Sequence, residues 1–206
     1  MATSISCKVV LVGEAGSGKT SIIKSFIHSS LNKNETSTLN ATYYNKVLEY
    51  ENNKRVVFDI WDTNGQEKFR SVTKHFYINA SIGILVYDIT SKHSFQQIKD
   101  FWYKELEENG EDNLVIAIVG NKIDKFYEEQ VTEDEGREYA DSVKAIFHLT
   151  SCVQQKGIHE LFKKCGERYL DLHRDKNEEK EEEKNKVTLK QEKHKEESVK
   201  KKKRRC

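Results

Sequence analysis

The sequence contains no proline and only four cysteines among its 206 residues. Without proline, glycine, asparagine and charged residues must mark the loops. Cys7, Cys152, Cys165 and Cys206 include no pair with the spacing of a zinc or redox motif. The cysteine pattern therefore argues against a disulfide-stabilised fold and predicts a reduced, cytosolic compartment.

Long apolar segments are also missing. No stretch approaches the ~18 apolar residues that a membrane-spanning helix needs. Residues 1–6 lack the basic and apolar regions of a secretory signal. Met1 is followed by Ala2 rather than the glycine that N-myristoylation requires. We expect neither secretion nor membrane spanning.

The charges are unevenly placed although the net charge is only +1. Acidic and basic residues alternate after position 174 with few apolar residues, and Lys200 to Arg205 are all basic. Such a segment cannot bury enough surface to offset its chain entropy. We predict one domain over 1–173 and a flexible charged tether over 174–206. The basic run resembles a nuclear-localisation sequence, but nothing in the domain supports nucleic-acid binding, and we predict none.

Apolar runs rich in β-branched residues alternate with amphipathic segments along the domain. The predicted strands cover 9–12, 56–60, 82–86, 114–119 and 145–149, with 42–50 as an edge strand hairpinned to 55–61. The predicted helices cover 19–30, 69–79, 94–108, 133–142 and 157–172. The pattern predicts an α/β fold with a six-stranded, mostly parallel sheet and helices on both faces. Ligands bind such sheets at the carboxyl ends of the strands.

A complete phosphate-binding P-loop pattern, Gly13 to Thr20, follows the first strand and opens a helix. Its backbone N–H groups can surround the β-phosphate, its lysine can contact the β- and γ-phosphates, and its threonine can bind Mg²⁺. The predicted nucleotide contacts from this segment are Ala15, Gly16, Ser17, Gly18, Lys19, Thr20 and Ser21. The pattern predicts a P-loop NTPase.

Asn121-Lys122-Ile123-Asp124 follows the apolar strand 114–119 and indicates which base is bound. Asp124 can accept hydrogen bonds from the N1–H and exocyclic amine of guanine, which adenine does not offer. Asn121 can contact N7 and tie this loop to the P-loop. A site built on such hydrogen bonds strongly rejects the wrong base, so we predict guanine selectivity.

The segment Asp62-Thr63-Asn64-Gly65-Gln66-Glu67 ends the strand 55–61. Asp62 can hold Mg²⁺ through a water, and the backbone N–H of Gly65 can approach the γ-phosphate. Gln66 can orient the attacking water and is the predicted catalytic residue.

The order of these motifs, with Thr150-Ser151-Cys152 after them, resembles the Ras superfamily over about residues 5–172. Within it, Trp61-Asp62-Thr63, the stretch 76–80 and the stretch 84–90 resemble Rab proteins, particularly the endocytic, early-endosomal branch. The resemblance implies the small G-protein fold, GTP and GDP as nucleotides, Mg²⁺ as the metal, and a GTPase that regulates vesicle trafficking.

Further roles are implied by the resemblance. Thr38 would complete the Mg²⁺ shell with Thr20 and Asp62. Base contacts are implied for Asn121, Lys122, Asp124, Ser151, Cys152 and Val153. The resemblance places switch I at about 31–43 and switch II at about 63–77, and effectors would bind there through Tyr43, Trp61 and Phe76. The implied partners also include an exchange factor, a GTPase-activating protein, a prenylation escort and a GDP-dissociation inhibitor.

Several residues depart from the family pattern and bear on the rates of exchange and hydrolysis. Leu31 and Val153 replace an aromatic and a lysine that cover the base, and Asn40 replaces a glycine. Ala15 and Asn64 lie near the hydrolysis machinery. They leave open a scaffold that binds GTP with little hydrolysis. Asp124 and the lack of an arginine-rich lid disfavour an ATP-dependent kinase.

Cys206 follows six basic residues. The resemblance implies a geranylgeranyl lipid at this cysteine. One lipid chain normally needs a second membrane signal, which the basic run can supply. We expect peripheral attachment to the cytosolic face of endosomal or other vesicular membranes.

Overall fold

The computed structural model describes residues 3–28, 42–62 and 77–173. The chain divides into two compact units, Met1–Tyr169 and Leu170–Cys206, and the sheet with its strands belongs to the first. The predicted domain boundary after residue 173 stays a prediction.

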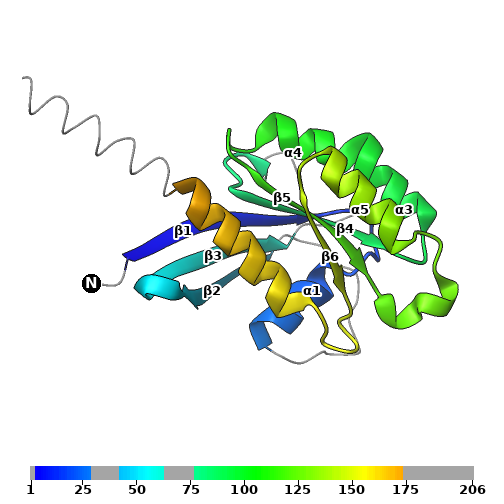
Figure 1. Ribbon diagram of the computed structural model, residues 1–206, viewed down its shortest axis with the longest axis horizontal. Helices are drawn as coiled ribbons and strands as arrows, with labels where there is room; N and C mark the ends of the chain where they lie inside the picture. The colour runs from blue at the N-terminus through cyan, green and yellow to red at the C-terminus, as the bar shows by residue number, and fades with distance from the viewer. Residues whose placement is uncertain (1–2, 29–41, 63–76, 174–206) are drawn as a thin grey trace, which may run out of the picture. The chain divides into compact units, whose positions relative to one another are not determined.

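A single sheet organises the first unit (Figure 1). Its strands are β1 (Thr3–Val12), β2 (Thr42–Tyr50), β3 (Lys54–Asp62), β4 (Ile82–Asp88), β5 (Val115–Asn121) and β6 (Ile146–Thr150). Their order across the sheet is β2-β3-β1-β4-β5-β6. Every neighbouring pair is parallel except β2 and β3. The predicted six-stranded, mostly parallel sheet is confirmed.

The strands β2 and β3 form the predicted antiparallel hairpin. A 3-10 turn, η1 (Glu51–Asn53), closes it, with Asn52 and Asn53 at φ 59° and 56°. Asparagine tolerates this left-handed backbone better than most residues because its short side chain can hydrogen-bond locally. The two asparagines thus suit the tight turn.

Helices cover both faces of the sheet, as predicted (Figure 1). They are α1 (Lys19–His28), α3 (Lys92–Gln97), α4 (Tyr103–Asn109), α5 (Glu133–Ser142) and a helix over 158–173, with a π turn η3 (Ile98–Trp102) and a 3-10 turn η4 (Ile123–Glu128). On one face, Phe26 of α1 stacks on Phe162 at 3.7 Å between ring centroids, and both meet Phe58 of β3 edge-on. On the other, Phe95 of α3 contacts Tyr87 of β4 and Tyr139 of α5.

Two helices begin at well-capped residues. The Ser91 side chain accepts a hydrogen bond from the Ser94 N–H, so α3 begins at Lys92, before the predicted residue 94. At α5, Thr132 and Glu135 form a reciprocal capping box. Each such cap stabilises its helix by about 1 kcal/mol.

Two elements differ from their predicted form. The strand β1 begins at Thr3 rather than residue 9, because its polar first half pairs with β3 from Lys54 onward. The helix predicted over 94–108 contains the π turn η3 between α3 and α4. Most of the helix predicted over 69–79 lies outside the described residues.

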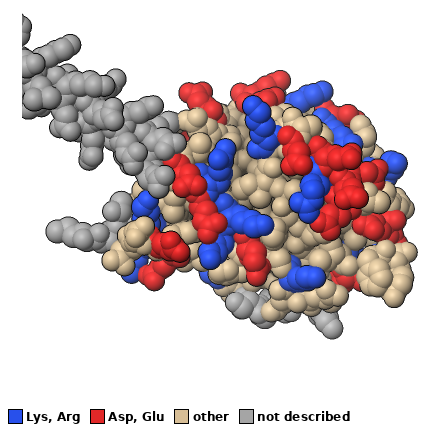
Figure 2. Space-filling model, viewed as in Figure 1, with Lys and Arg blue, Asp and Glu red and all other residues tan. Residues whose placement is uncertain are grey.

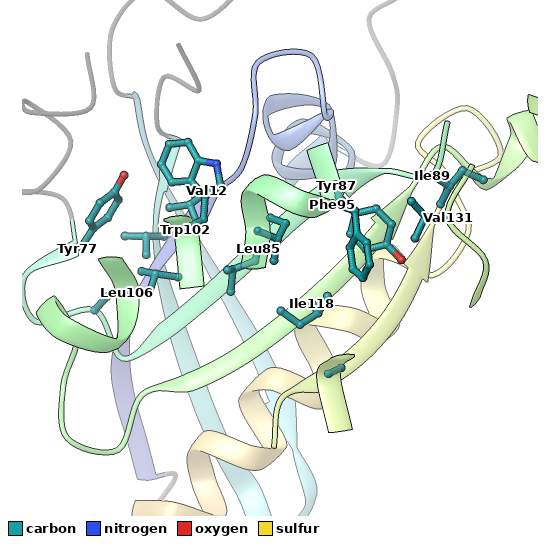
Figure 3. Packing of buried hydrophobic residues seen from close by; sticks show 14 residues of the cluster. Val12, Tyr77, Leu85, Tyr87, Ile89, Phe95, Trp102, Leu106, Ile118 and Val131 are labelled. Carbon is teal, nitrogen blue, oxygen red and sulfur yellow. The ribbon is translucent and has the colours of Figure 1, made fainter. Parts of the chain in front are cut away.

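A buried apolar cluster lies between the sheet and the segment α3-η3-α4 (Figure 3). Its residues include Val12 of β1, Leu85 of β4 and Trp102 of η3, and each of these three is at most 1% exposed. Burying a large apolar side chain contributes about 1.5–3 kcal/mol. The cluster therefore fixes η3 against β4, β5 and β1, the strand that leads into the P-loop.

The three cysteines in the described part of the chain, Cys7, Cys152 and Cys165, are buried and form no disulfide there. Burial raises the pKa of the Cys165 thiol to about 12. Burial also raises the pKa of the Cys7 thiol, so Cys7 and Cys165 are neutral packing residues at ordinary pH.

Candidate nucleotide-binding site

The predicted functional residues gather where the parallel strands end. Strand register places Leu11 beside Asp62, Asp88 beside Asn121, and Asn121 beside Thr150. Because these strands run in the same direction, their carboxyl ends meet at one edge of the sheet. The loops after β1, β3 and β5 therefore share a site.

Two of the P-loop glycines occupy positions that no other residue fits. Gly13 and Gly18 have φ of 138° and 100°. A Cβ at Gly13 would lie 2.1 Å from the Val86 carbonyl oxygen, and one at Gly18 would lie 2.2 Å from Asn121 Nδ2. The loop therefore packs directly on β4 and on the Asn121 side chain. Such close turns aim backbone N–H groups at an anion.

Lys19, at the first position of α1, is only 5% exposed. Its Nζ donates hydrogen bonds to the carbonyl oxygens of Gly13 at 2.8 Å and Glu14 at 3.0 Å. Burial lowers the pKa of Lys19 to about 8, although the carboxylates of Asp62 and Glu14 pull the other way. A buried cation is costly without a full anionic partner. The residues present therefore fit a phosphate group.

Thr20 and Asp62 are in direct contact. The Thr20 hydroxyl donates to Asp62 Oδ2 at 2.7 Å, and Asp62 is 1% exposed. A hydroxyl beside a carboxylate is an oxygen donor set suited to Mg²⁺. The structure thus brings together two of the three predicted metal ligands, while Thr38 lies outside the described residues.

Asn121 connects three segments of the site. Its Nδ2 donates to the Ser17 carbonyl oxygen at 2.9 Å, and its Oδ1 accepts from the Thr150 hydroxyl at 3.0 Å. The Cys152 Sγ lies 3.9 Å from the same Oδ1. The predicted tie from this loop to the P-loop is present. Its contact with guanine stays a prediction.

Asp124 is the predicted base-reading carboxylate. Its Oδ1 accepts a hydrogen bond from the Ser151 hydroxyl at 2.5 Å. Ser151 is fixed by two backbone hydrogen bonds with Lys156. The side chain of Val153 at the tip of that turn is 69% exposed. The loop after β6 therefore orients the Asp124 carboxylate and leaves the Val153 side chain exposed to solvent.

An ion pair that the sequence analysis did not identify supports the same loop. Lys122 Nζ lies 2.6 Å from Asp88 Oδ2, and Lys122 adopts a left-handed backbone with φ 69°. The N–H and hydroxyl of Thr90 both donate to Asp88 Oδ1. Burial by itself raises the pKa of Asp88, but the bonds from Lys122 and Thr90 hold that pKa below its usual value. An aspartate two residues before a threonine at a strand end is a local signal for such a turn.

Two residues of the predicted effector surface also lie together. Tyr43 of β2 packs edge-on against Trp61 of β3 at 5.4 Å between ring centroids. The Tyr43 hydroxyl donates to Asp59 Oδ1 at 2.5 Å, and Asn45 donates to the same oxygen. Tyr43 remains 51% exposed. Half of this aromatic side chain is thus available to a partner.

The remaining predicted site residues fall partly within and partly outside the described part of the chain. Ala15 and Gly16 are exposed on the P-loop, and Ser21 is half-buried on α1. The positions outside the described residues are Leu31, Thr38, Asn40, Asn64, Gly65, Gln66, Phe76 and Cys206.

Within 3–28, 42–62 and 77–173, no helix is long and apolar enough to cross a bilayer. The same ranges hold no cluster of three or more His, Cys, Asp or Glu side chains suited to a metal.

The sequence is similar to that of known proteins over most of its length. The Ras family model matches residues 8–171. Human Ras-related protein Rab-22A is 41% identical over 155 residues, covering 75% of this chain and 79% of the relative. Human Ras-related protein Rab-21 is 43% identical over 157 residues, covering 76% of this chain and 69% of that relative. The chain therefore belongs to the Ras family, and its similarity to these proteins confirms the predicted resemblance to Rab proteins.

Proposed function

We propose that the chain is a Rab-type molecular switch that binds GTP, hydrolyses it slowly to GDP and phosphate, and regulates vesicle and endosomal trafficking. The proposal rests on one observation. One edge of the sheet brings together the buried Lys19, the Thr20–Asp62 pair and the Asp124–Ser151 pair. Together they offer contacts for phosphate, metal and base.

Each part of the site has a separate task. The P-loop and Lys19 bind the phosphates, and Thr20 with Asp62 holds Mg²⁺, which neutralises phosphate charge when bound. Asp124 reads guanine, while Asn121 joins the base loop to the P-loop through Ser17. An adenine nucleotide could not donate two hydrogen bonds to the Asp124 carboxylate, and this mismatch disfavours a kinase or an ATPase.

The exposed Tyr43–Trp61 pair is the proposed effector surface, together with Phe76. Aromatic residues with a polar tip are favoured at protein interfaces. An exchange factor and a GTPase-activating protein would set the balance between GDP and GTP states. A prenylation escort and a GDP-dissociation inhibitor would handle the lipidated form.

Replacing Gln66 by leucine is expected to lower single-turnover GTP hydrolysis while leaving GDP affinity unchanged. The glutamine orients water and does not hold the nucleotide, so its loss raises only the barrier to hydrolysis. Loss of a group that positions the reaction costs roughly tenfold to a hundredfold in rate. Phosphate release from preloaded GTP measures the effect.

The matched control is Gln96→Leu, a change at an exposed glutamine of α3 that bonds Asp100 of η3. It should hydrolyse GTP at the wild-type rate. If Gln66→Leu and wild type hydrolyse equally slowly, and no activating protein accelerates wild type, the chain works as a GTP-binding scaffold. Ala15 and Asn64, which depart from the family pattern, motivate that second candidate.

Membrane attachment is proposed to depend on Cys206 and the basic run from Lys200 to Arg205. A single lipid chain binds reversibly, and each basic residue adds about 1 kcal/mol near an anionic membrane. Cys206→Ser should therefore abolish membrane association in cells, and neutralising the basic run should weaken it. Sedimentation of membranes from cell extracts measures both effects.

Cys165→Ser is the control for the loss of a thiol. That cysteine is fully buried in the helix over 158–173, so it is not accessible for lipid attachment. Membrane association of Cys206→Ser at the wild-type level would place the anchor elsewhere.

Nucleic acid is not among the proposed partners. Figure 2 shows acidic and basic side chains interspersed over the visible face of the described residues. Duplex binding generally uses a continuous basic stripe that neutralises several phosphates. The mixed charge of this face does not offer one.

A further inference from the structure

The helical segment that covers β4 contains a π turn. Within η3, the N–H of Tyr103 bonds to the carbonyl oxygen of Ile98, five residues earlier. A π turn inserts one residue into the helical register and occurs frequently at functional sites. Its last residue, Trp102, is 1% exposed and belongs to the cluster shown in Figure 3. The turn thus places a large indole ring in the same buried cluster as Val12, the last residue of β1.

The Trp102 indole forms a polar contact across the fold. Its Nε1 donates a hydrogen bond to Glu14 Oε1 at 3.2 Å, between residues 88 positions apart. Glu14 is the second residue of the P-loop. A buried indole N–H strongly favours such an acceptor, because a donor without one loses its hydration uncompensated.

The main chain of Glu14 in turn holds the P-loop together. Its carbonyl oxygen accepts from Ser17 N at 3.2 Å and from Lys19 Nζ at 3.0 Å. The first bond closes the turn of the loop, and the second fixes the position of the phosphate-binding lysine. Glu14 thus has a side chain bonded to the buried cluster and a carbonyl oxygen that accepts two hydrogen bonds within the loop.

We propose that Trp102 is a positioning residue for the nucleotide: it holds Glu14, and through the Glu14 carbonyl it holds the P-loop turn and Lys19 in their binding geometry. The inference rests on the proposed nucleotide binding and extends it to a residue that touches no nucleotide. The rigid element is the buried cluster, and the bond from Nε1 to Oε1 transmits its position to the loop.

If Trp102 served only in packing, a different experimental result would be expected. Phenylalanine at position 102 would keep an aromatic ring in the cluster and remove only the N–H donor. If the ring matters solely for packing, GDP release should follow the loss of thermal stability. If the hydrogen bond positions the loop, GDP release should accelerate beyond what the stability change explains.

The experiment measures release of a fluorescent GDP analogue into excess unlabelled GDP at fixed Mg²⁺. Trp102→Phe is expected to accelerate release about tenfold, which corresponds to about 1.4 kcal/mol. Glu14→Ala should accelerate release by a similar factor. Glu14→Gln keeps the acceptor oxygen, so its rate of GDP release should be close to that of the wild type. The double variant Trp102→Phe with Glu14→Ala should be no faster than the faster single variant, because both remove the same bond.

Two controls lie on the same helical segment. Tyr103→Phe removes a hydroxyl that bonds the exposed Glu107, and should leave release unchanged. Phe95→Leu weakens the same cluster at a residue that packs on Tyr87 and Tyr139, and should lower thermal stability with little effect on release.

The inference is overturned if folded Trp102→Phe and Glu14→Ala release GDP at the wild-type rate. It is also overturned if Phe95→Leu, at an equal loss of thermal stability, accelerates release as much as Trp102→Phe. Failure of the wild-type chain to bind the GDP analogue would be a different result, because it would contradict the proposed function itself.

Discussion

Asp124→Asn is expected to change the preferred nucleotide from guanosine to xanthosine diphosphate. The carboxylate accepts from two guanine donors, whereas an amide can donate to the oxygen that replaces the exocyclic amine in xanthine. Sites that read a base by hydrogen bonds discriminate by roughly 10⁴-fold, because the wrong ligand leaves a polar group unpaired. Competition of GDP and xanthosine diphosphate for the fluorescent analogue measures the preference.

The control is Asp134→Asn, which removes an exposed carboxylate in the first turn of α5. This variant should keep the wild-type preference for GDP. Ser151 bonds Asp124 in the wild type and can still bond an amide oxygen, so the loop should keep its position. An Asp124→Asn protein that still prefers GDP would show that this residue does not read the base.

The second large effect is expected from Thr20→Asn. This change replaces the hydroxyl that bonds Asp62 Oδ2 with a larger amide at the proposed Mg²⁺ position. Because a bound metal stabilises phosphate charge by several kcal/mol, GTP affinity should fall roughly a hundredfold or more in the presence of Mg²⁺. GDP affinity should fall less, so the variant should accumulate in the GDP-bound or empty state.

Thr132→Asn is the matched control for this substitution. Thr132 caps α5, and asparagine is an equally good capping residue. Titrations of both variants with and without Mg²⁺ separate the metal contribution from general damage. Equal Mg²⁺ dependence of GTP affinity in Thr20→Asn and wild type would contradict the assignment of Thr20 as a metal ligand.

Much of the fold was predictable because it depends on local patterns. Continuous apolar runs marked the buried strands, and Gly13 to Thr20 fixed where a strand must turn into a helix. The strand pairing then follows from the preference for buried parallel sheets with helical crossovers. The predicted tie from Asn121 to the P-loop was also deducible, since both motifs lie at the carboxyl ends of parallel strands, β1 and β5, on either side of β4.

The remaining features depend on tertiary contacts that leave no local pattern. The polar start of β1 is a strand because β3 lies beside it. The π turn at η3 interrupts a segment whose apolar spacing resembles an ordinary helix. The bond from Trp102 to Glu14 joins residues that no sequence spacing relates. The pair of Lys122 and Asp88 depends on the register of β4 and β5, which places Asp88 beside Asn121.

Identifying the nucleotide bound to the purified chain tests the proposed function most directly. Protein prepared in the presence of Mg²⁺ is denatured, and the released nucleotide is separated by chromatography and quantified against protein. We predict close to one guanine nucleotide per chain, mostly GDP, and its loss when Lys19 is replaced by alanine. An adenine nucleotide at the same stoichiometry, or no guanine binding when GDP is supplied, would contradict the central claim.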